Sequence, residues 1–398
     1  MKNSLLIMIL GLAMLTANAQ QTYVPDDNFE QALINQGYDN VQDDYVLTSN
    51  IDILTYLDVS NQNISDLTGI EDFTNLTYLD CYNNQLTSLD ISQNIIDYLI
   101  CYNNQITSIN LNTNLFNLSC WENNLTSLNV SSNANLTYLY CGTNQITTID
   151  LSQNPYLSSL MADNNALTDI DLSNNPNLTG VRLDNNQLNL LDLSYQDIQY
   201  LNCSNNQITD LIIDSDSLQE LFCGNNPISI FDATPHHNLE MLEIFNAGLF
   251  SIDLSQNQNL WFLSIGENPD LWNLDLSNNT SLEHLDVWTN SLSNLDMRNG
   301  NNHNMSYFVT WNCWGSQYLE CISVDDSTYS TTNWTSIDTW HYFSNNCNPA
   351  TNIAEFEDKK QLLKIVNIIG EEVAVLKENQ IYFYIYNDGK VVKQLNSK

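Results

Sequence analysis

The sequence predicts a solenoid, a stack of short repeating units with a parallel β-sheet on its concave face. A leucine-type residue returns every 19 to 23 positions from Leu57 to Phe308, and most copies read L-x-x-L-x-C/L/I-x-x-N-x-L/I, as in LTYLDCYNNQL from Leu76 to Leu86. A unit of this length cannot bury its own apolar residues, so it must stack on copies of itself. The long open surface that results suits binding better than a catalytic pocket.

The first residues have the pattern of a signal peptide. Lys2 precedes the apolar run LLIMILGLAML, and Ala17-Asn18-Ala19 is a small-x-small cleavage site. The run is too short to span a bilayer as a mature helix. We therefore expect residues 1–19 to be removed on export, the mature chain to start at Gln20, and no membrane insertion of that chain.

Charge separates a long acidic body from a more basic end. The net charge is -37, and Arg182 and Arg298 are the only basic residues between Ser4 and Asp358, whereas seven of the ten lie from Lys359 onward. This shift predicts a boundary near residue 350. Such an acidic surface repels nucleic acid and anionic lipid, which excludes both as partners. The negative charge could serve to bind a cationic partner; the simpler explanation is that it keeps the protein soluble in salty surroundings.

Residues 20–50 are expected to form an N-terminal cap over the exposed end of the stack. The segment VPDDNFEQALINQGYD predicts a short amphipathic helix, capped by Asp26 or Asp27 and with Phe29, Leu33 and Ile34 as its apolar stripe.

Residues 51–325 are expected to hold the repeats, as about 13 or 14 parallel strands spaced ~4.8 Å apart, with turns and irregular chain on the outer arcs. A buried amide in each turn can bond backbone groups of its own and the next turn. This position holds Asn84, Asn104, Asn123, Asn144, Asn165, Asn186, Asn206, Asn226, Asn268 and Asn290, with Cys313 in its place near the end.

The cysteines fall into two groups. Six share one inward strand position that aliphatic residues fill elsewhere, which predicts small, free core residues: Cys81, Cys101, Cys120, Cys141, Cys203 and Cys223. Neighbouring strands hold them too far apart for disulfides, and no histidine or carboxylate joins them as a metal ligand. Cys321 and Cys347 are expected to form a disulfide that pins a C-terminal cap at residues 326–350, with Cys313 as the alternative partner.

No catalytic or metal-binding constellation is evident, so we expect no enzyme activity, no cofactor and no metal. The pair His236-His237 interrupts a repeat and is expected on a protruding surface loop, while Asp39, Asp43 and Asp44 lack the spacing of a calcium loop. Carboxylates such as Asp90, Asp150, Asp171, Asp253 and Asp275 recur at the repeat period, which indicates a structural role.

The concave face is expected to carry the ligand site, because strand residues that flank the inward positions point to solvent. These positions hold three columns of aromatic residues, which together usually mark an interface. The densest part comprises Tyr78, Tyr82, Tyr98, Tyr102, Trp121, Tyr138 and Tyr140; the columns continue through Tyr56, Tyr200, Phe222, Phe245, Phe262, Trp288 and Trp311. The alternative is that stacked aromatic rings merely stabilise the sheet.

The units L-x-x-L-x-C-x-x-N-x-L-T-x-L-D-L-S-x-N resemble bacterial leucine-rich repeats of the internalin type, in the variety with a stacked cysteine column. The segments YVPDDNFEQALINQGYD and LECISVDDSTYSTTNW, the latter followed by Cys347, are similar to the caps of secreted members. Residues 351–398 form a predicted small all-β tail with KIVNIIGEEV and IYNDGKVVKQL. This tail resembles the end of type IX secretion sorting domains of Gram-negative bacteria, but it is shorter than these domains.

The resemblance implies adhesion and protein binding. We therefore expect a secreted or cell-surface, non-enzymatic protein of a Gram-negative bacterium, which recognises a protein or polysaccharide ligand through its aromatic concave face and meets the export machinery through its tail. The alternatives are a glycan-directed extracellular enzyme and a structural cell-surface component.

Overall fold

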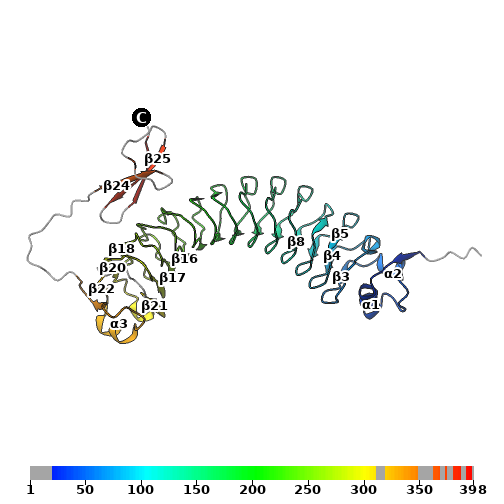
Figure 1. Ribbon diagram of the computed structural model, residues 1–398, viewed down its shortest axis with the longest axis horizontal. Coiled ribbons are helices and arrows are strands. Elements are labelled where there is room, and N and C mark those ends of the chain that lie inside the picture. The colour runs from blue at the N-terminus through cyan, green and yellow to red at the C-terminus, as the bar shows by residue number, and fades with distance from the viewer. Residues whose placement is uncertain are drawn as a thin grey trace, which may run out of the picture.

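The chain forms a curved solenoid (Figure 1). The computed structural model describes residues 20–310, 319–347, 362–367, 373, 380–386 and 391–396. The predicted signal peptide, Trp311 and Cys313 lie outside these residues. Within them, no helix is long and apolar enough to cross a membrane.

A 13-stranded parallel sheet lines the concave face and confirms the predicted fold. Its order follows the chain from one end to the other, and each strand pairs in register with the next, as Leu57 does with Leu79. The strands are β3 (Tyr56–Asp58), β4 (Tyr78–Asp80), β6 (Tyr98–Ile100), β8 (Asn117–Ser119), β9 (Tyr138–Tyr140), β10 (Ser159–Met161), β11 (Gly180–Arg182), β13 (Tyr200–Asn202), β15 (Glu220–Phe222), β16 (Met241–Glu243), β17 (Phe262–Ser264), β19 (His284–Asp286) and β21 (Tyr307–Val309).

The core lies behind this sheet and is built from residues that repeat at the same place in each turn. Leu79 and Cys81, two positions apart on and after β4, are both fully buried, while Tyr78 and Tyr82 beside them reach the surface. This alternation follows from the pleat of a β-strand. Six cysteines, Cys81, Cys101, Cys120, Cys141, Cys203 and Cys223, are buried and free. Burial raises the pKa of each thiol, in Cys203 to about 12, so these side chains act as small apolar core residues.

The predicted asparagine column bonds one turn to the next. The Nδ2 of Asn206 donates to the carbonyl oxygens of Leu183, Cys203 and Ser204 at 2.9, 3.0 and 3.3 Å, and its Oδ1 accepts from the N–H of Leu188 at 3.0 Å. Where the column is broken at Ala247, Oδ1 of Asn268 accepts from the N–H groups of both Ala247 and Leu249. These amides satisfy backbone groups that no strand ladder reaches.

A second column of buried amides lies on the outer side, and the sequence analysis did not identify it. The Nδ2 of Asn175 donates to the carbonyl oxygens of Leu151 and Asn154, both in the preceding turn. Equivalent positions hold Asn94, Asn112, Asn133, Asn154, Gln196, His236, Asn257, Asn279 and Asn299. His236 is therefore buried, with Nδ1 2.7 Å from the Ser215 carbonyl oxygen, and the prediction of a protruding loop was wrong for it.

The outer arcs contain more regular structure than expected. Short parallel strands pair there as β5 (Ser88–Asp90) with β7 (Ser108–Asn110), β12 (Leu190–Leu193) with β14 (Asp210–Ile213), and β18 (Asn273–Asp275) with β20 (Asn294–Met297). The recurring carboxylates form turns on the outer arcs: Oδ1 of Asp90 accepts from the N–H of Ser92, and Asp150, Asp171, Asp253 and Asp275 repeat the contact.

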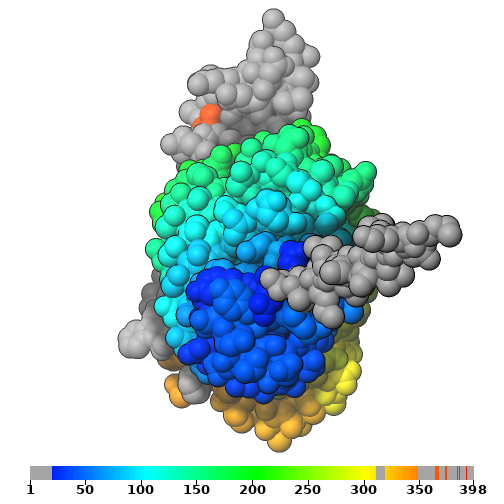
Figure 2. All heavy atoms as spheres, turned by 90° about the vertical axis from the view of Figure 1, so that its right-hand side faces the viewer, coloured from blue at the N-terminus to red at the C-terminus, as the bar shows by residue number. Residues whose placement is uncertain are grey.

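The N-terminal cap covers the first turn of the stack, as Figure 2 shows from that end. Its elements are β1 (Gln21–Tyr23), α1 (Asp27–Asn35), β2 (Tyr45–Leu47) and α2 (Thr48–Ile51); the 3-10 helix η1 (Ile70–Asp72) lies in the first outer arc, between β3 and β4. Asp26 is the N-cap of α1; its Oδ1 accepts from the N–H groups of Asn28 and Phe29 at 3.0 Å. The buried stripe comprises Phe29, Ala32 and Leu33, whereas Ile34 is only half-buried.

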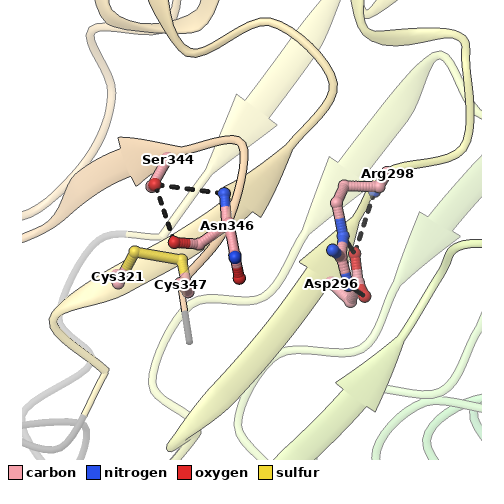
Figure 3. The surroundings of a disulfide bond; sticks show 6 residues. All are labelled: Asp296, Arg298, Cys321, Ser344, Asn346 and Cys347. Carbon is pink, nitrogen blue, oxygen red and sulfur yellow. Dashed lines mark hydrogen bonds and ion pairs between the residues drawn. A yellow bond between two sulfur atoms is a disulfide. The ribbon is translucent and has the colours of Figure 1, made fainter. Parts of the chain in front are cut away.

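The C-terminal cap continues the outer sheet through β22 (Cys321–Val324) and β23 (Tyr342–Ser344) and adds helix α3 (Ser327–Asn333). A disulfide joins Cys321 and Cys347, with 5.6 Å between the Cα atoms (Figure 3), and this is the pair that the sequence predicted. The rings of Phe308, Trp334 and Phe343 pack within 6.2 Å of one another beneath the cap.

The tail contains a three-stranded antiparallel sheet of β24 (Leu362–Asn367), β25 (Gln380–Tyr386) and β26 (Val391–Asn396). Residues 387–390, which connect β25 to β26, lie outside the described residues.

Candidate functional site: the aromatic concave face

A first column of aromatic rings runs along the N-terminal half of the concave sheet; we call it the tyrosine column. Tyr56, Tyr78 and Tyr98 pair in register on β3, β4 and β6, with ring centroids 4.9 and 6.0 Å apart. On β8 the matching position holds Asn117, but the ring of Phe116 fills the gap, 5.6 Å from both Tyr98 and Tyr138. Phe116 was not predicted from the sequence, because this residue stands one position before the aligned one.

A second column, which we call the Trp121 column, lies just beyond the ends of the same strands. Tyr82, Tyr102 and Trp121 stack nearly parallel, with centroids 4.7 and 4.3 Å apart and interplanar angles of 11° and 15°. The column ends because the next position is Gly142, where an added Cβ would lie 2.7 Å from a carboxylate oxygen of Asp163. An acidic group therefore stands where a fourth ring would lie.

The structure brings the seven predicted ligand-binding residues together, and none of them is buried. Tyr98 is 40% exposed, and Tyr78, Tyr82, Tyr102, Trp121, Tyr138 and Tyr140 are half-buried. Tyr140 belongs with the tyrosine column, since its ring lies 6.4 Å from that of Tyr138. The rings of Tyr56, Tyr78 and Tyr98, and those of Tyr82, Tyr102 and Trp121, stack face to face along the solenoid, whereas the contacts that Phe116 and Tyr140 make are tilted or edge-on.

Carboxylates flank the aromatic columns. Asp58 and Asp80 pair in register on β3 and β4, between the two columns. Burial raises the pKa of Asp80 to about 6, the nearby charge of Asp58 adds to the rise, and a hydrogen bond from the N–H of Tyr82 opposes it. Near the other end, burial also raises the pKa of Glu243 and of Asp286.

The raised pKa of Asp80 predicts a pH-dependent stability. Ionising this group costs more in the folded protein than in the unfolded chain, so the free energy of unfolding falls as the pH rises from 3.8 through about 6. We expect Asp80→Asn, which keeps an acceptor for the Tyr82 N–H, to raise the thermal midpoint at pH 7.5 and leave it nearly unchanged at pH 4. Asp169→Asn, an exposed position on the outer arc, is the control. An equal rise at both pH values would show that ionisation is not the cause.

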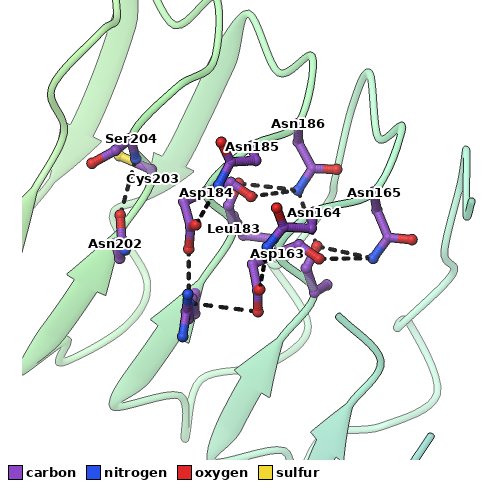
Figure 4. A network of polar contacts seen from close by, with 12 residues as sticks. Asp163, Asn164, Asn165, Leu183, Asp184, Asn185, Asn186, Asn202, Cys203 and Ser204 are labelled. Atoms are coloured by element: carbon purple, nitrogen blue, oxygen red, sulfur yellow. Dashed lines mark hydrogen bonds and ion pairs between the residues drawn. The ribbon is translucent and has the colours of Figure 1, made fainter. Parts of the chain in front are cut away.

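Arg182 pairs with two carboxylates in the middle of the concave face; Figure 4 labels both of them, Asp163 and Asp184. The Nε of Arg182 on β11 lies 2.8 Å from Oδ1 of Asp184 and 3.5 Å from Oδ1 of Asp163. Arg298, the other arginine of the solenoid, pairs with Asp296 (Figure 3). Over residues 20–310, therefore, both arginines are paired with carboxylates and the excess charge of the concave face is negative.

A second aromatic cluster occupies the C-terminal half. The rings of Phe262, His284 and Tyr307 stack on β17, β19 and β21 with centroids 4.3 and 4.2 Å apart. His284 and Tyr307 occupy the register position of the tyrosine column, a signal that the sequence analysis did not follow this far. The ring of Trp288 lies over Gly266, where an added Cβ would come within 2.6 Å of it.

Known proteins share this architecture. The model of a family of leucine-rich repeats (two copies) matches residues 54–94. Internalin J of Listeria monocytogenes serotype 4b (strain F2365) is 42% identical over 76 residues, which are 18% of this chain and 8% of internalin J.

Solved structures of bacterial leucine-rich-repeat proteins have the same fold. The functional domain of InlJ from Listeria monocytogenes, which includes a cysteine ladder, is 29% identical with a TM-score of 0.61, over 77% of this chain and 76% of that one. An internalin, InlF, from L. monocytogenes str. 4b F2365 has 23% identity and a TM-score of 0.61, over 82% of this chain and 97% of its own, and shows the fold alone. The protein therefore has a leucine-rich-repeat fold of the internalin-like type.

Proposed function

We propose that this protein is exported and binds a polypeptide ligand outside the cell through its aromatic concave face, without catalysing a reaction. The observation that supports this proposal most directly is the pair of stacked columns on an open sheet: partly exposed tyrosine and tryptophan side chains, side by side over β3, β4, β6, β8 and β9. Tyrosine and tryptophan dominate protein hot spots because they offer large rigid area with a polar group.

The orientation of the rings favours a polypeptide over a polysaccharide. A sugar binds an aromatic residue by stacking on its ring face, but both faces of Tyr102 and one face each of Tyr82 and Trp121 are taken up by neighbouring rings, 4.7 and 4.3 Å apart. The hydroxyl groups and ring edges that remain can bond and pack against a peptide backbone and its side chains. The asparagine-rich turns beside them add further donors and acceptors.

Charge indicates the kind of polypeptide. Asp58, Asp80, Asp163 and Asp184 flank the columns, and within residues 20–310 the basic groups nearby are limited to the paired Arg182. A basic segment is complementary to this face, and complementary charge increases both the association rate and the specificity.

A glycan-directed enzyme is the alternative function, and one observation favours it. Asp58 and Asp80 lie in register on adjacent strands, and the pKa of Asp80 is raised to about 6. Two neighbouring carboxylates, one of them with a raised pKa, are the kind of pair that retaining glycosidases use. A structural cell-surface role is the third possibility, and it requires no ligand on this face.

The two ends of the chain support the proposed export and extracellular location. Residues 1–19 have the pattern of a signal peptide, and the tail of β24, β25 and β26 has a composition and β-structure of its own. We include in the proposal that the tail directs the protein to the surface of a Gram-negative bacterium, or beyond it, through the export machinery.

An array of extracellular proteins and glycans, combined with a panel of glycoside hydrolase substrates, tests the proposed function. We expect saturable binding to basic polypeptides that weakens as the ionic strength rises, and no turnover of any glycan. Binding confined to glycans would contradict the polypeptide proposal. Hydrolysis that Asp80→Asn abolishes would establish the enzyme instead, and binding to neither class would favour the structural role.

A further inference from the structure

Three carboxylates converge in the N-terminal cap, away from the concave site. Asp27 and Glu30 lie in the first turn of α1, and Asp44 directly precedes β2. One oxygen from each side chain lies within 4.8 Å of the other two. Helix and loop therefore present three acidic groups to a common point, although the residues are 17 positions apart along the chain.

Glu30 is the unusual member of this cluster, because its side chain is fully buried. Its Oε1 accepts a hydrogen bond of 2.8 Å from the N–H of Asp43, whereas its Oε2 is buried and has no hydrogen-bond partner among the residues that the structure describes. Burying a carboxylate oxygen without a partner is costly, so such groups in folded proteins are paired or bind a cation.

No basic side chain of the solenoid can neutralise the cluster. Arg182 and Arg298 are the only arginine or lysine residues over positions 20–310, and they pair with Asp184 and Asp296 in turns far along the solenoid. Asp26, the carboxylate next to the cluster, is fully engaged, since Oδ1 caps α1 and Oδ2 accepts from the N–H and hydroxyl of Ser65. Within residues 20–310, therefore, no lysine or arginine is left to balance the cluster, and a cation from solution can supply this charge.

We propose that Asp27, Glu30 and Asp44 bind one Ca²⁺ ion. Three carboxylates and no nitrogen or sulfur ligand suit a hard divalent cation, and Ca²⁺ accepts irregular sets of oxygen ligands, with water completing its shell. Mg²⁺ is less suited, because it demands near-octahedral geometry from its ligands. The sequence indicated no such site, since its ligands come from two segments rather than from one calcium loop.

The ion would link two parts of the N-terminal cap, helix α1 and the β1–β2 pair. The carbonyl oxygen of Asp44 accepts from the N–H of Val24, which follows β1, so Asp44 already connects the β1–β2 pair to the loop before it. Binding to Asp27 and Glu30 adds a link from this pair to α1, whose Phe29 and Leu33 cover the first turn of the core. Sites on extracellular modules typically bind Ca²⁺ with dissociation constants of about 10⁻⁴–10⁻³ M.

Calorimetric titration of the EDTA-treated full chain with CaCl₂ in 0.15 M NaCl tests this proposal. We expect one saturable site per chain, at least ten-fold weaker binding of MgCl₂, and a rise in the thermal midpoint of about 2 °C or more at saturating Ca²⁺. Glu30→Gln and Asp44→Asn should each weaken Ca²⁺ binding at least ten-fold. Both substitutions keep the size of the side chain, and asparagine tolerates the positive φ of 66° at position 44.

Asp169→Asn is the matched control, since it removes one exposed charge from the outer arc and should leave the titration unchanged. A wild-type chain without a saturable site would overturn the proposal. Equal losses in Asp169→Asn and the two cap variants would overturn it as well, because they would show diffuse attraction of cations to the acidic surface. If Glu30→Gln fails to fold, Asp44→Asn, which is exposed, decides the question.

Discussion

Replacing Tyr82, Tyr102 and Trp121 together by alanine is expected to weaken binding of an array-selected polypeptide by at least about 100-fold. The three rings form one continuous, nearly parallel stack, so their removal deletes a contiguous contact area. The measurement is a binding titration by surface plasmon resonance, with thermal unfolding followed in parallel. Losing two stacked pairs should cost about 1–3 kcal/mol of stability, which a solenoid of this size can tolerate.

Two controls separate ligand contact from sheet stabilisation. Tyr195→Ala removes a ring that is 66% exposed on the outer arc, and it should bind as the wild type does. The double variant Tyr82→Phe, Tyr102→Phe keeps the stack but removes both hydroxyl groups, and it should bind several-fold more weakly with an unchanged melting curve. Normal binding by the folded alanine variant would show that the columns only stabilise the sheet.

Asn226→Ala is expected to have the largest effect on stability, about 3 kcal/mol or more. The Nδ2 of Asn226 donates to the carbonyl oxygens of Cys203, Cys223 and Gly224, and its Oδ1 accepts from the N–H of Ile208, all inside the solenoid. Each buried backbone group left without a partner costs about 1–3 kcal/mol. The next column position is Ala247, so the amide of the following turn cannot take over.

Denaturant unfolding of the wild type and the variant measures this effect. Asn174→Ala is the control, because Asn174 is exposed and its amide donates to the Ser173 hydroxyl at 3.4 Å, a contact whose loss should change stability by less than about 0.5 kcal/mol. Similar midpoints for Asn226→Ala and Asn174→Ala would mean that water or a backbone shift satisfies the abandoned groups.

Repetition made most of the fold predictable from the sequence. The inward leucines, the cysteine position and the column from Asn84 to Asn290 recur at one period. Each of these positions is buried in the same way in every repeat, so each copy of the repeat gives further support to the same prediction. The second amide column recurs as regularly, but Asn154, Asn175 and their equivalents were not recognised as a column, since asparagine is also common in turns. His236 was placed on a protruding loop because the His-His pair interrupts a repeat, yet it stands 21 positions before Asn257, in the same buried position.

The site was predictable only where it followed the strand register. Tyr78, Tyr82 and their neighbours project from aligned positions, so the alternation of strand side chains was enough to group them. Phe116 stands one residue before the aligned position, and the sequence does not show that its ring fills the space between Tyr98 and Tyr138. The burial of Glu30 depends on how α1 packs against the following loop, and no period in the sequence reports this.

The disulfide of the C-terminal cap has a mechanical consequence. Each turn of the solenoid contacts only its neighbours, so tension applied at a chain end would peel the turns away one after another. If the tail is held at the cell surface while the concave face holds a ligand, the load enters the solenoid through Cys347. The disulfide transmits that force directly from Cys347 to Cys321, 26 positions earlier in the chain, so the cap between them carries little of it. Cys321 begins β22, which runs parallel to β20 in the outer sheet. The cross-link therefore protects the end of the stack from unravelling under load.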